Sequence, residues 1–185
     1  MFIMLAGSYP EEAEIVGRIL GGYPELEFAM LICVYEARED FDAVFKSLFG
    51  VRGETRRVQK AEALGRPNYQ KLGLGTEFEM AIGAMRHFLR IRNQYAHAHW
   101  LANPTGLGVV DLEEPLDQGA KVDGSSQFKF HETNLEILKT QEKFGVNVRE
   151  MFHWLEVEAM SRRGKLPKNQ VPKPKQVAQP LLYKR

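Results

Sequence analysis

The stretch TEFEMAIGAMRHFLRIRNQYAHAHW, residues 76–100, decides the expected fold because its pattern of apolar and polar residues predicts one long amphipathic helix. It opens with Thr76-Glu77-Phe78-Glu79, a capping box in which the first and fourth side chains satisfy free amides of the opening turn. Asn103-Pro104 supplies a stop, so the helix is predicted to run from Thr76 to between Trp100 and Thr105. Its apolar residues recur at helical spacing on one stripe: Phe78, Ile82, Met85, Leu89 and Ala96.

Two helices are predicted before this one. Ser8-Tyr9-Pro10-Glu11 has the capping serine and early proline of a helix start, and Gly21-Gly22 predicts an end near Leu20. Pro24 opens a longer helix, which Gly50 is expected to end after Phe49. The predicted buried stripe of this second helix consists of Phe28, Leu31, Val34, Phe41, Phe45 and Leu48.

The stretch from 51 to 75 is polar and broken by glycines and Pro67, so we expect one short helix over 54–64 and then a loop. After the long helix, residues 108–112 and 127–131 read as two short strands, which predicts a small β-hairpin. Thr133-Asn134-Leu135-Glu136 is a second capping box, and it begins a last helix that Gly164 ends. The predicted inner face of this last helix carries Leu138, Val148, Phe152, Leu155 and Ala159.

Together these elements predict an all-α fold, a four- to five-helix up-down bundle with a small β-hairpin inserted before the last helix. Residues 1–163 are assigned to this helical domain and residues 164–185 to a C-terminal tail. The tail is expected to be extended rather than helical, because it contains Pro167, Pro172, Pro174 and Pro180.

The net charge of +1 hides an asymmetry between this tail and the rest of the chain. The tail holds six basic residues and no acidic one, which leaves 19 basic against 24 acidic residues elsewhere. A global basic field for nucleic acid is therefore excluded, whereas a local basic arm is present. The tail could bind an RNA backbone, dock on the acidic body, lie across a partner subunit, or be a solvated charge run.

Cysteine usage and the N-terminus indicate the expected compartment. Cys33 is the sole cysteine and lies in an apolar run, so a buried thiol is favoured over a reactive one and no internal disulfide can form. Residues 1–8 lack the features of a signal peptide, and no segment is long and apolar enough for a membrane span. A soluble cytoplasmic protein without a membrane partner is expected.

One charged residue interrupts the apolar stripe of the long helix. At about a hundred degrees per residue, Arg92 falls in the middle of the arc that carries Phe78 and Leu89. A guanidinium in such a place needs a carboxylate or a phosphate. It is either a structural ion pair with an acid on a neighbouring helix, such as Glu36, Asp40 or Asp42, or a phosphate ligand in a cleft or dimer interface.

The neighbours of Arg92 add chemistry to this position. Asn93 and His97 are four residues apart, so a helix places both at the edge of the same arc. A histidine can exchange a proton near neutral pH, and a guanidinium can stabilise developing negative charge on a phosphate. Arg92, Asn93 and His97 together therefore have the residue types needed for phosphodiester chemistry.

The segment Arg92-Asn93-Gln94-Tyr95-Ala96-His97 resembles the arginine, polar residue, spacer and histidine motif of HEPN domains (higher eukaryotes and prokaryotes nucleotide-binding). The resemblance is close over about ten residues near the end of a long helix; elsewhere it is an agreement of helical architecture. It implies an α-helical bundle in which the arginine, the asparagine and the histidine carry the activity. Many members of the family are metal-independent endoribonucleases, and many act as toxins or phage-defence effectors.

The resemblance also implies partners and a mechanism. RNA would lie between two copies of a homodimer, His97 would act as the general acid or base, and Arg92 would bind the scissile phosphate. Asn93 would hold the phosphate or His97, and neither a metal nor another cofactor would be required. An antitoxin protein is a further partner that the resemblance suggests. The alternative is a non-catalytic HEPN-like protein that binds nucleotide or RNA, or a helical interaction protein.

Three further residues are candidates for contact with RNA, each with a structural alternative. Tyr95 could stack on a base or pack in the core, and His99 could support the site or lie at the edge of the core. Arg38 could add to a basic cleft or pair with an acid. His97 and His99 are two residues apart, so on a helix they point to different faces and do not predict a metal site.

Overall fold

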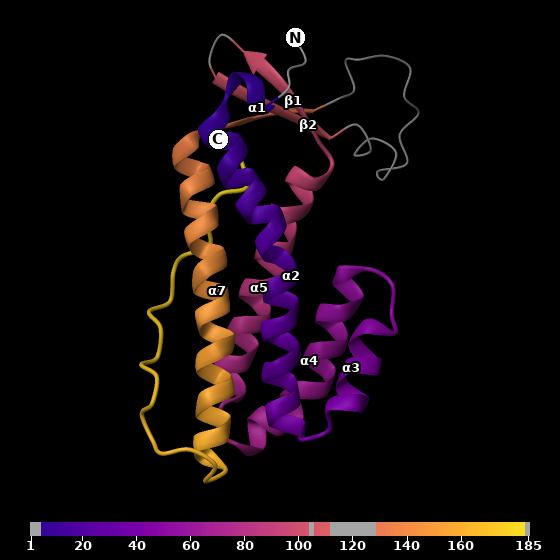
Figure 1. The fold of residues 1–185 in the computed structure, drawn as a ribbon, viewed down its shortest axis with the longest axis vertical. Coiled ribbons are helices and arrows are strands. Elements are labelled where there is room, and N and C mark those ends of the chain that lie inside the picture. The colour runs from indigo at the N-terminus through magenta and orange to yellow at the C-terminus, as the bar shows by residue number, and fades with distance from the viewer. Residues whose placement is uncertain (1–4, 104–105, 112–128, 184–185) are drawn as a thin grey trace. The chain divides into compact units, whose positions relative to one another are not determined.

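The computed structural model describes residues 5–103, 106–111 and 129–183, which group into two units. The sheet unit takes the described residues within 1–21, 90–143 and 180–185, and the helical unit takes 22–89 and 144–179. Three helices contribute residues to both units: α2 (Pro10–Arg38), α5 (Gly75–Ala96) and α7 (Leu135–Arg162). The chain is therefore mostly helical and carries a small three-stranded antiparallel sheet (Figure 1).

The first long helix does not stop where its glycines predict. After the single-turn α1 (Leu5–Ser8), α2 runs through Gly21-Gly22 and Pro24, so the predicted end near Leu20 is wrong. Its buried side chains keep helical spacing across this stretch, and their burial outweighs a local cost of about 1 kcal/mol per glycine and about 3 kcal/mol for the proline. These buried side chains include Ile15, Ile19, Tyr23, Leu26, Met30 and Val34.

The break in the predicted second helix comes at Glu39, where α2 gives way to α3 (Phe41–Phe49). Glu39 adopts a left-handed φ of 62°. Its carboxylate pairs with Lys165 Nζ at 2.6 Å and with Arg163 Nη1 at 3.1 Å. The hydrogen bond from Lys165, followed by the charge of Arg163, lowers the pKa of Glu39. Asp40 then caps α3 by accepting a hydrogen bond from the Ala43 amide at 3.0 Å.

Half of the stripe predicted for this second helix lies outside the core. Leu31, Val34 and Leu48 are buried as predicted. The other three members are exposed, which corrects the expectation for them: Phe28 by 60%, Phe41 by 45% and Phe45 by 45%. Phe41 and Phe45 instead stack on one another along the outside of α3, with ring centroids 5.9 Å apart.

The helix after α3 is longer than its composition predicts. α4 (Glu54–Lys71) continues through Gly65 and Pro67, so the loop predicted after residue 64 is wrong. Arg57 holds its first turns by donating to both carboxylate oxygens of Glu27 at 2.9 and 3.0 Å. Further along, Gly65 lies so close to the ring of Phe78 that a Cβ would be 2.4 Å from Cζ. Phe78 in turn stacks on Tyr69, with 4.5 Å between ring centroids.

The sole cysteine lies in the core of the helical unit. Cys33 is fully buried, and the Tyr69 hydroxyl donates to its carbonyl oxygen at 2.8 Å. Because that hydroxyl proton is used, the thiol donates to the hydroxyl oxygen, 2.9 Å from Sγ. Burial raises the pKa of Cys33 to about 12. The prediction of a buried rather than a reactive thiol is confirmed.

The helix over residues 76–100 ends at least four residues earlier than predicted, at Ala96 rather than between Trp100 and Thr105. Phe78, Ile82, Met85 and Leu89 are buried as predicted, but α5 ends at Ala96, which is exposed. The chain then enters β1 (Ala98–Asn103), a strand that the sequence pattern does not predict. Pairing of Trp100 with Val109 in the neighbouring strand replaces the helical bonds that these residues would otherwise make.

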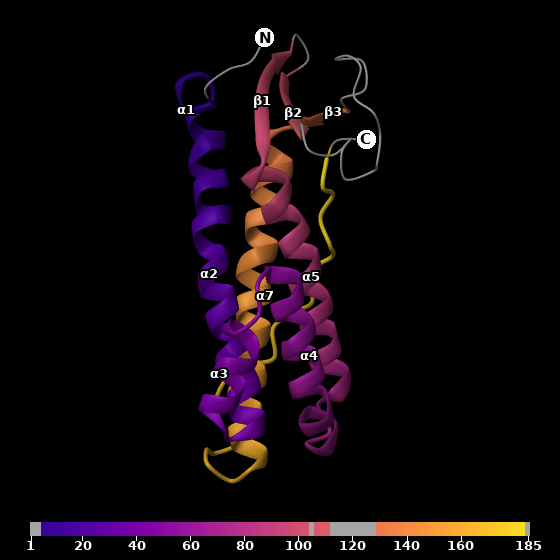
Figure 2. The ribbon, with the colours of Figure 1, turned by 90° about the vertical axis from the view of Figure 1, so that its right-hand side faces the viewer.

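The sheet extends the predicted hairpin by this additional strand. Its antiparallel order is β1, β2 (Gly106–Asp111) and β3 (Phe130–Thr133), as Figure 2 shows. Val109 lies at its centre, paired with Trp100 on one side and with His131 on the other. β2 and β3 confirm the two predicted strands, while Leu112, Gln127 and Phe128 lie outside the described residues.

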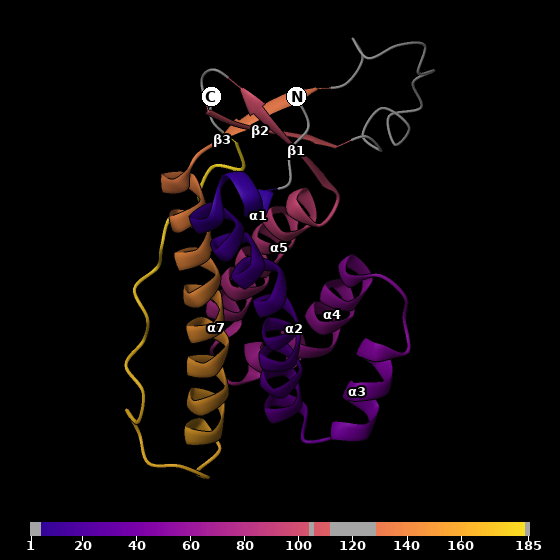
Figure 3. The same ribbon diagram turned by 45° about the horizontal axis from the view of Figure 1, so that its top comes forward.

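The last helix begins one residue later than its capping box predicts, because Thr133 belongs to β3 and Asn134 is the cap; the tail is extended as predicted. Asn134 caps α7 by accepting from the Ile137 amide at 2.9 Å, and Gly164 ends it with a left-handed φ of 75°. All five residues predicted for its inner face are buried. The described tail residues form no helix or strand, and residues 165–179 run back beside α7 (Figure 3). In the described part of the chain, no helix combines the length and apolarity needed to cross a bilayer.

Alanine in place of a helical glycine usually stabilises a protein, but the contact between Gly65 and Phe78 predicts that Gly65→Ala destabilises this one. Gly65→Ala should lower the free energy of unfolding by about 1–3 kcal/mol, because the new methyl group must displace a ring that is stacked in the core. Gly83→Ala in α5 is the matched control: it has open space at Cβ and should gain up to about 1 kcal/mol from helix propensity. Urea unfolding followed by circular dichroism measures both, and equal stabilisation of the two variants would contradict this packing.

Candidate functional site

The motif residues occupy the last turn of α5 and the turn after it, all within the sheet unit. Arg92 and Asn93 are half-buried, and Arg92 Nη1 donates to Asn93 Oδ1 at 3.0 Å. The amide oxygen of Asn93 thus orients the guanidinium plane. The structure brings these two predicted site residues into direct contact.

His97 is the first residue beyond α5, and its side chain is exposed. It therefore lies in the turn that leads into β1 rather than on a continuing helix. The helical geometry that placed it beside Asn93 on one arc holds only as far as Ala96. An exposed imidazole in a turn is accessible to solvent and to a substrate, which are the requirements for proton transfer.

Tyr95 occupies a packing position rather than an open surface. It is only 3% exposed, its ring stacks on Trp100 with centroids 5.7 Å apart, and its hydroxyl donates to Gln141 Oε1 at 2.6 Å. Burial raises the pKa of Tyr95, and the nearby polar side chains of Thr133, Gln94 and Gln141 offset part of that rise. This placement favours the core role that the sequence left open over stacking on a base.

His99 and Arg38 lie on other elements than the α5 motif. His99 is exposed on β1, where its backbone pairs with Val110, so it lies on the strand that follows α5 and not on the predicted helix. Arg38 is the exposed last residue of α2 and belongs to the helical unit. Neither residue is part of the contact between Arg92 and Asn93.

The acids proposed as structural partners for Arg92 have contacts within the helical unit. Glu36 lies 3.7 Å from Lys165 Nζ, Asp40 caps α3, and Asp42 pairs with Lys46 at 2.6 Å. Among residues 5–103, 106–111 and 129–183, no cluster of three histidine, cysteine or acidic side chains could hold a metal ion.

Gln94 is a residue of this region that the motif did not identify. Its side chain is buried, and Nε2 donates to the carbonyl oxygen of Leu182 at 2.9 Å. Gln141 donates to the same carbonyl at 3.0 Å and to that of Leu181 at 2.7 Å. Next to Leu182, Tyr183 stacks on His131 of β3 with 3.9 Å between ring centroids. The end of the tail is therefore bound beside the motif residues. The sequence signal that could have identified Gln94 is its position between the apolar Ile91 and Tyr95, where a polar side chain needs a buried partner.

Comparisons with known proteins add nothing to this geometry. The chain matches no protein-family model, no characterised protein and no solved structure at a significant level of similarity.

The buried bond between Tyr95 and Gln141 makes Tyr95→Phe informative. Removing the hydroxyl leaves Gln141 Oε1 buried without this donor, so the free energy of unfolding should fall by about 1–3 kcal/mol. Amide hydrogen exchange should also rise at residues 181–183, because Gln141 loses the bond that orients its amide. Tyr35→Phe is the control, since Tyr35 is half-buried and packs edge-on against Phe41. Similar exchange in both variants would contradict the proposed link.

Proposed function

We propose that this protein is a HEPN-type, metal-independent endoribonuclease that uses Arg92, Asn93 and His97. The observation that carries the proposal is the hydrogen bond from Arg92 to Asn93 at the end of α5, directly before an exposed His97. A half-buried guanidinium with a fixed plane suits a phosphate, and an exposed imidazole suits proton transfer. The HEPN-like bundle remains part of the proposal, resting on the motif and on the helical architecture.

The proposed reaction is an attack by a ribose 2′-hydroxyl on the adjacent phosphorus. His97 takes the hydroxyl proton as a general base, or in its protonated form gives a proton to the leaving 5′-oxygen. Arg92 binds the non-bridging phosphate oxygens and stabilises the charge that grows on them in the transition state. The products are a 2′,3′-cyclic phosphate and a 5′-hydroxyl, so the atoms balance without water or a metal.

Two copies of the chain would supply the complete site. In the proposal, RNA lies between the α5 ends of a homodimer, where each copy contributes one Arg92 and one His97. The duplicated motif lets one imidazole accept a proton while the other donates one. A toxin or defence role with a protein antitoxin, and a cytoplasmic location, belong to the same proposal.

Cleavage of RNA in the presence of EDTA tests the proposal. The purified full chain should convert a 5′-labelled RNA to products ending in 2′,3′-cyclic phosphate. Arg92→Ala and His97→Ala should each lower the rate by about 100-fold or more, because proton transfer alone contributes about 10² to 10⁴. Arg92→Lys should recover little, since an ammonium cannot form the planar contact with Asn93.

His153→Ala is the matched control for the histidine variant. His153 is exposed on α7 in the helical unit, so its removal should leave both cleavage and thermal unfolding unchanged. Binding of RNA without turnover, weakened by Arg92→Ala, would point to the non-catalytic alternative. Cleavage that survives both motif substitutions would exclude the proposed site.

A further inference from the structure

One buried amide on α7 holds the backbone of the tail. Asn147 is 5% exposed; its Nδ2 donates to the carbonyl oxygen of Lys175 at 2.9 Å, and its Oδ1 accepts from the Val177 amide at 3.4 Å. A side-chain amide has one acceptor and one donor side, so it matches the two main-chain groups of an extended peptide. These contacts involve only the backbone of the tail, and they would form with many peptide sequences.

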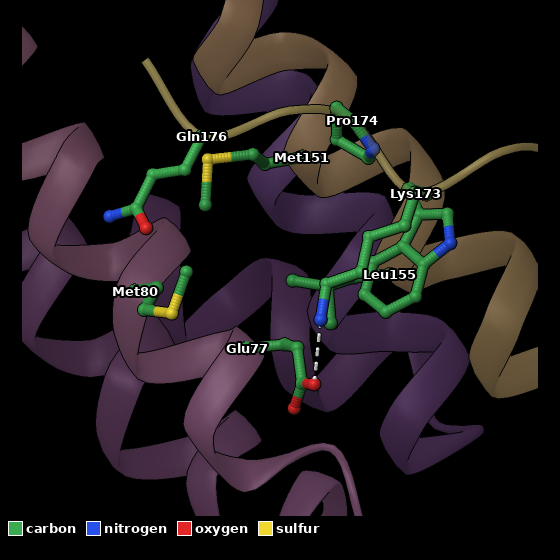
Figure 4. A pocket seen from close by; sticks show the side chains of 8 residues that line it. Glu77, Met80, Met151, Leu155, Lys173, Pro174 and Gln176 are labelled. Atoms are coloured by element: carbon green, nitrogen blue, oxygen red, sulfur yellow. Dashed lines mark hydrogen bonds and ion pairs between the residues drawn. The ribbon is translucent and has the colours of Figure 1, made fainter. Parts of the chain in front are cut away.

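A neighbouring contact does select a side chain. Lys173 Nζ lies 2.9 Å from Glu77 Oε1 of α5 (Figure 4). It also lies 5.1 Å from the ring centroid of Trp154 of α7. An acid and an aromatic face together favour a cation over a neutral side chain. Glu77 and Trp154 therefore add side-chain selectivity to the backbone contacts of Asn147. A bound peptide needs a lysine or arginine two residues before the residue that occupies the place of Lys175.

The residues between these contacts cover an incompletely filled pocket. Pro174 and Gln176 lie over Met80, Met151 and Leu155, around a small space of about 20 Å³, room for about one water molecule (Figure 4). Methionine side chains adapt to ligands of different shape. A proline in an extended segment lowers the entropy lost on binding. The surface under the tail thus has the features of a peptide-binding site.

The tail itself behaves as a bound segment rather than as part of the core. None of its described residues from 165 to 183 is classed as buried or belongs to a helix or strand. It leaves α7 through two left-handed residues, Gly164 and Asn169. In the sheet unit its end is again held through main-chain carbonyls, by Gln94 and Gln141. Repeated backbone recognition is a mode of binding that does not depend on the tail being covalently attached.

We propose that the tail-binding face of the helical unit (Glu77, Met80, Asn147, Met151, Trp154 and Leu155) is a site for an extended peptide with a Lys-Pro pair. The chain's own residues 173–177 occupy this site in cis. A segment of the same chemistry from another protein competes for it. Attachment gives the tail an effective concentration in the millimolar range, so competition is weak until the tail is released. The proposal is independent of ribonuclease activity.

A fluorescent peptide with the sequence VPKPKQVAQ, residues 171–179, tests this site by fluorescence anisotropy. It should bind the full-length Lys173→Glu protein at least about tenfold more tightly than the wild type, because the acid in place of Lys173 repels Glu77 and releases the tail. Lys168→Glu is the matched control, with the same charge change on an exposed tail residue outside the tail-binding face, and should behave as the wild type.

Variants of the site and of the peptide complete the experiment. Asn147→Ala added to Lys173→Glu should abolish peptide binding, with circular dichroism reporting the fold. If that double variant unfolds, a peptide N-methylated at Val177 serves instead, since it lacks the N–H group that donates to Asn147 Oδ1. Equal affinity for wild type and Lys173→Glu, no binding to Lys173→Glu, or full binding of the N-methylated peptide would each overturn the proposal.

Peptide affinity should also depend on pH through Glu77. The hydrogen bond from Lys173 is the largest influence that lowers the pKa of Glu77 below its ordinary value. A lowered pKa means that the ion pair contributes fully above about pH 4.3 and is lost as the pH falls through the lower value in the complex. Affinity of the peptide for the Lys173→Glu protein should therefore fall as the pH drops below the ordinary pKa of glutamate, whereas Glu77→Gln should give a weaker affinity and a smaller fall. A pH profile unchanged by Glu77→Gln would contradict the proposed recognition of the lysine by Glu77.

Discussion

The hydrogen bond between the Tyr95 hydroxyl and Gln141 is the interaction on which the sheet unit depends most. Both groups are buried, so each needs the other once water is excluded. The bond joins the last turn of α5 to α7, and it uses the oxygen of the Gln141 amide. The nitrogen of that amide is then directed to the carbonyls of Leu181 and Leu182. One buried amide thereby connects the last turn of the motif helix with the end of the tail.

Sequence periodicity predicted the elements whose start and end signals agree with their packing. The terminating Gly164, the buried inner face of α7 and the buried stripe of α5 up to Leu89 are examples. It was wrong where a local stop signal competes with burial. Gly21-Gly22 and Pro67 lie inside helices because the apolar residues on either side keep one helical face. The break at Glu39 depends on Lys165 and Arg163, which are distant in sequence and leave no local signal.

The sequence predicted which residue types the candidate site contains, but only part of how those residues are arranged. The motif named Arg92 and Asn93, which form a hydrogen bond, and it named an exposed His97. The helical wheel failed after Ala96, because pairing of Trp100 with Val109 replaces the last helical turn with a strand. Gln94 and Asn147 were missed for a different reason. Their partners are main-chain groups of the tail, and a backbone contact leaves no complementary residue type to search for.

The burial of Cys33 has a practical consequence for experiments on this chain. Burial raises the pKa of the thiol to about 12, so little of it is thiolate at neutral pH, and the sulfur contacts the hydroxyl of Tyr69 inside the core. Maleimide dyes and spin labels will therefore spare the native residue. A single cysteine introduced on the surface can be labelled selectively, without first mutating the core.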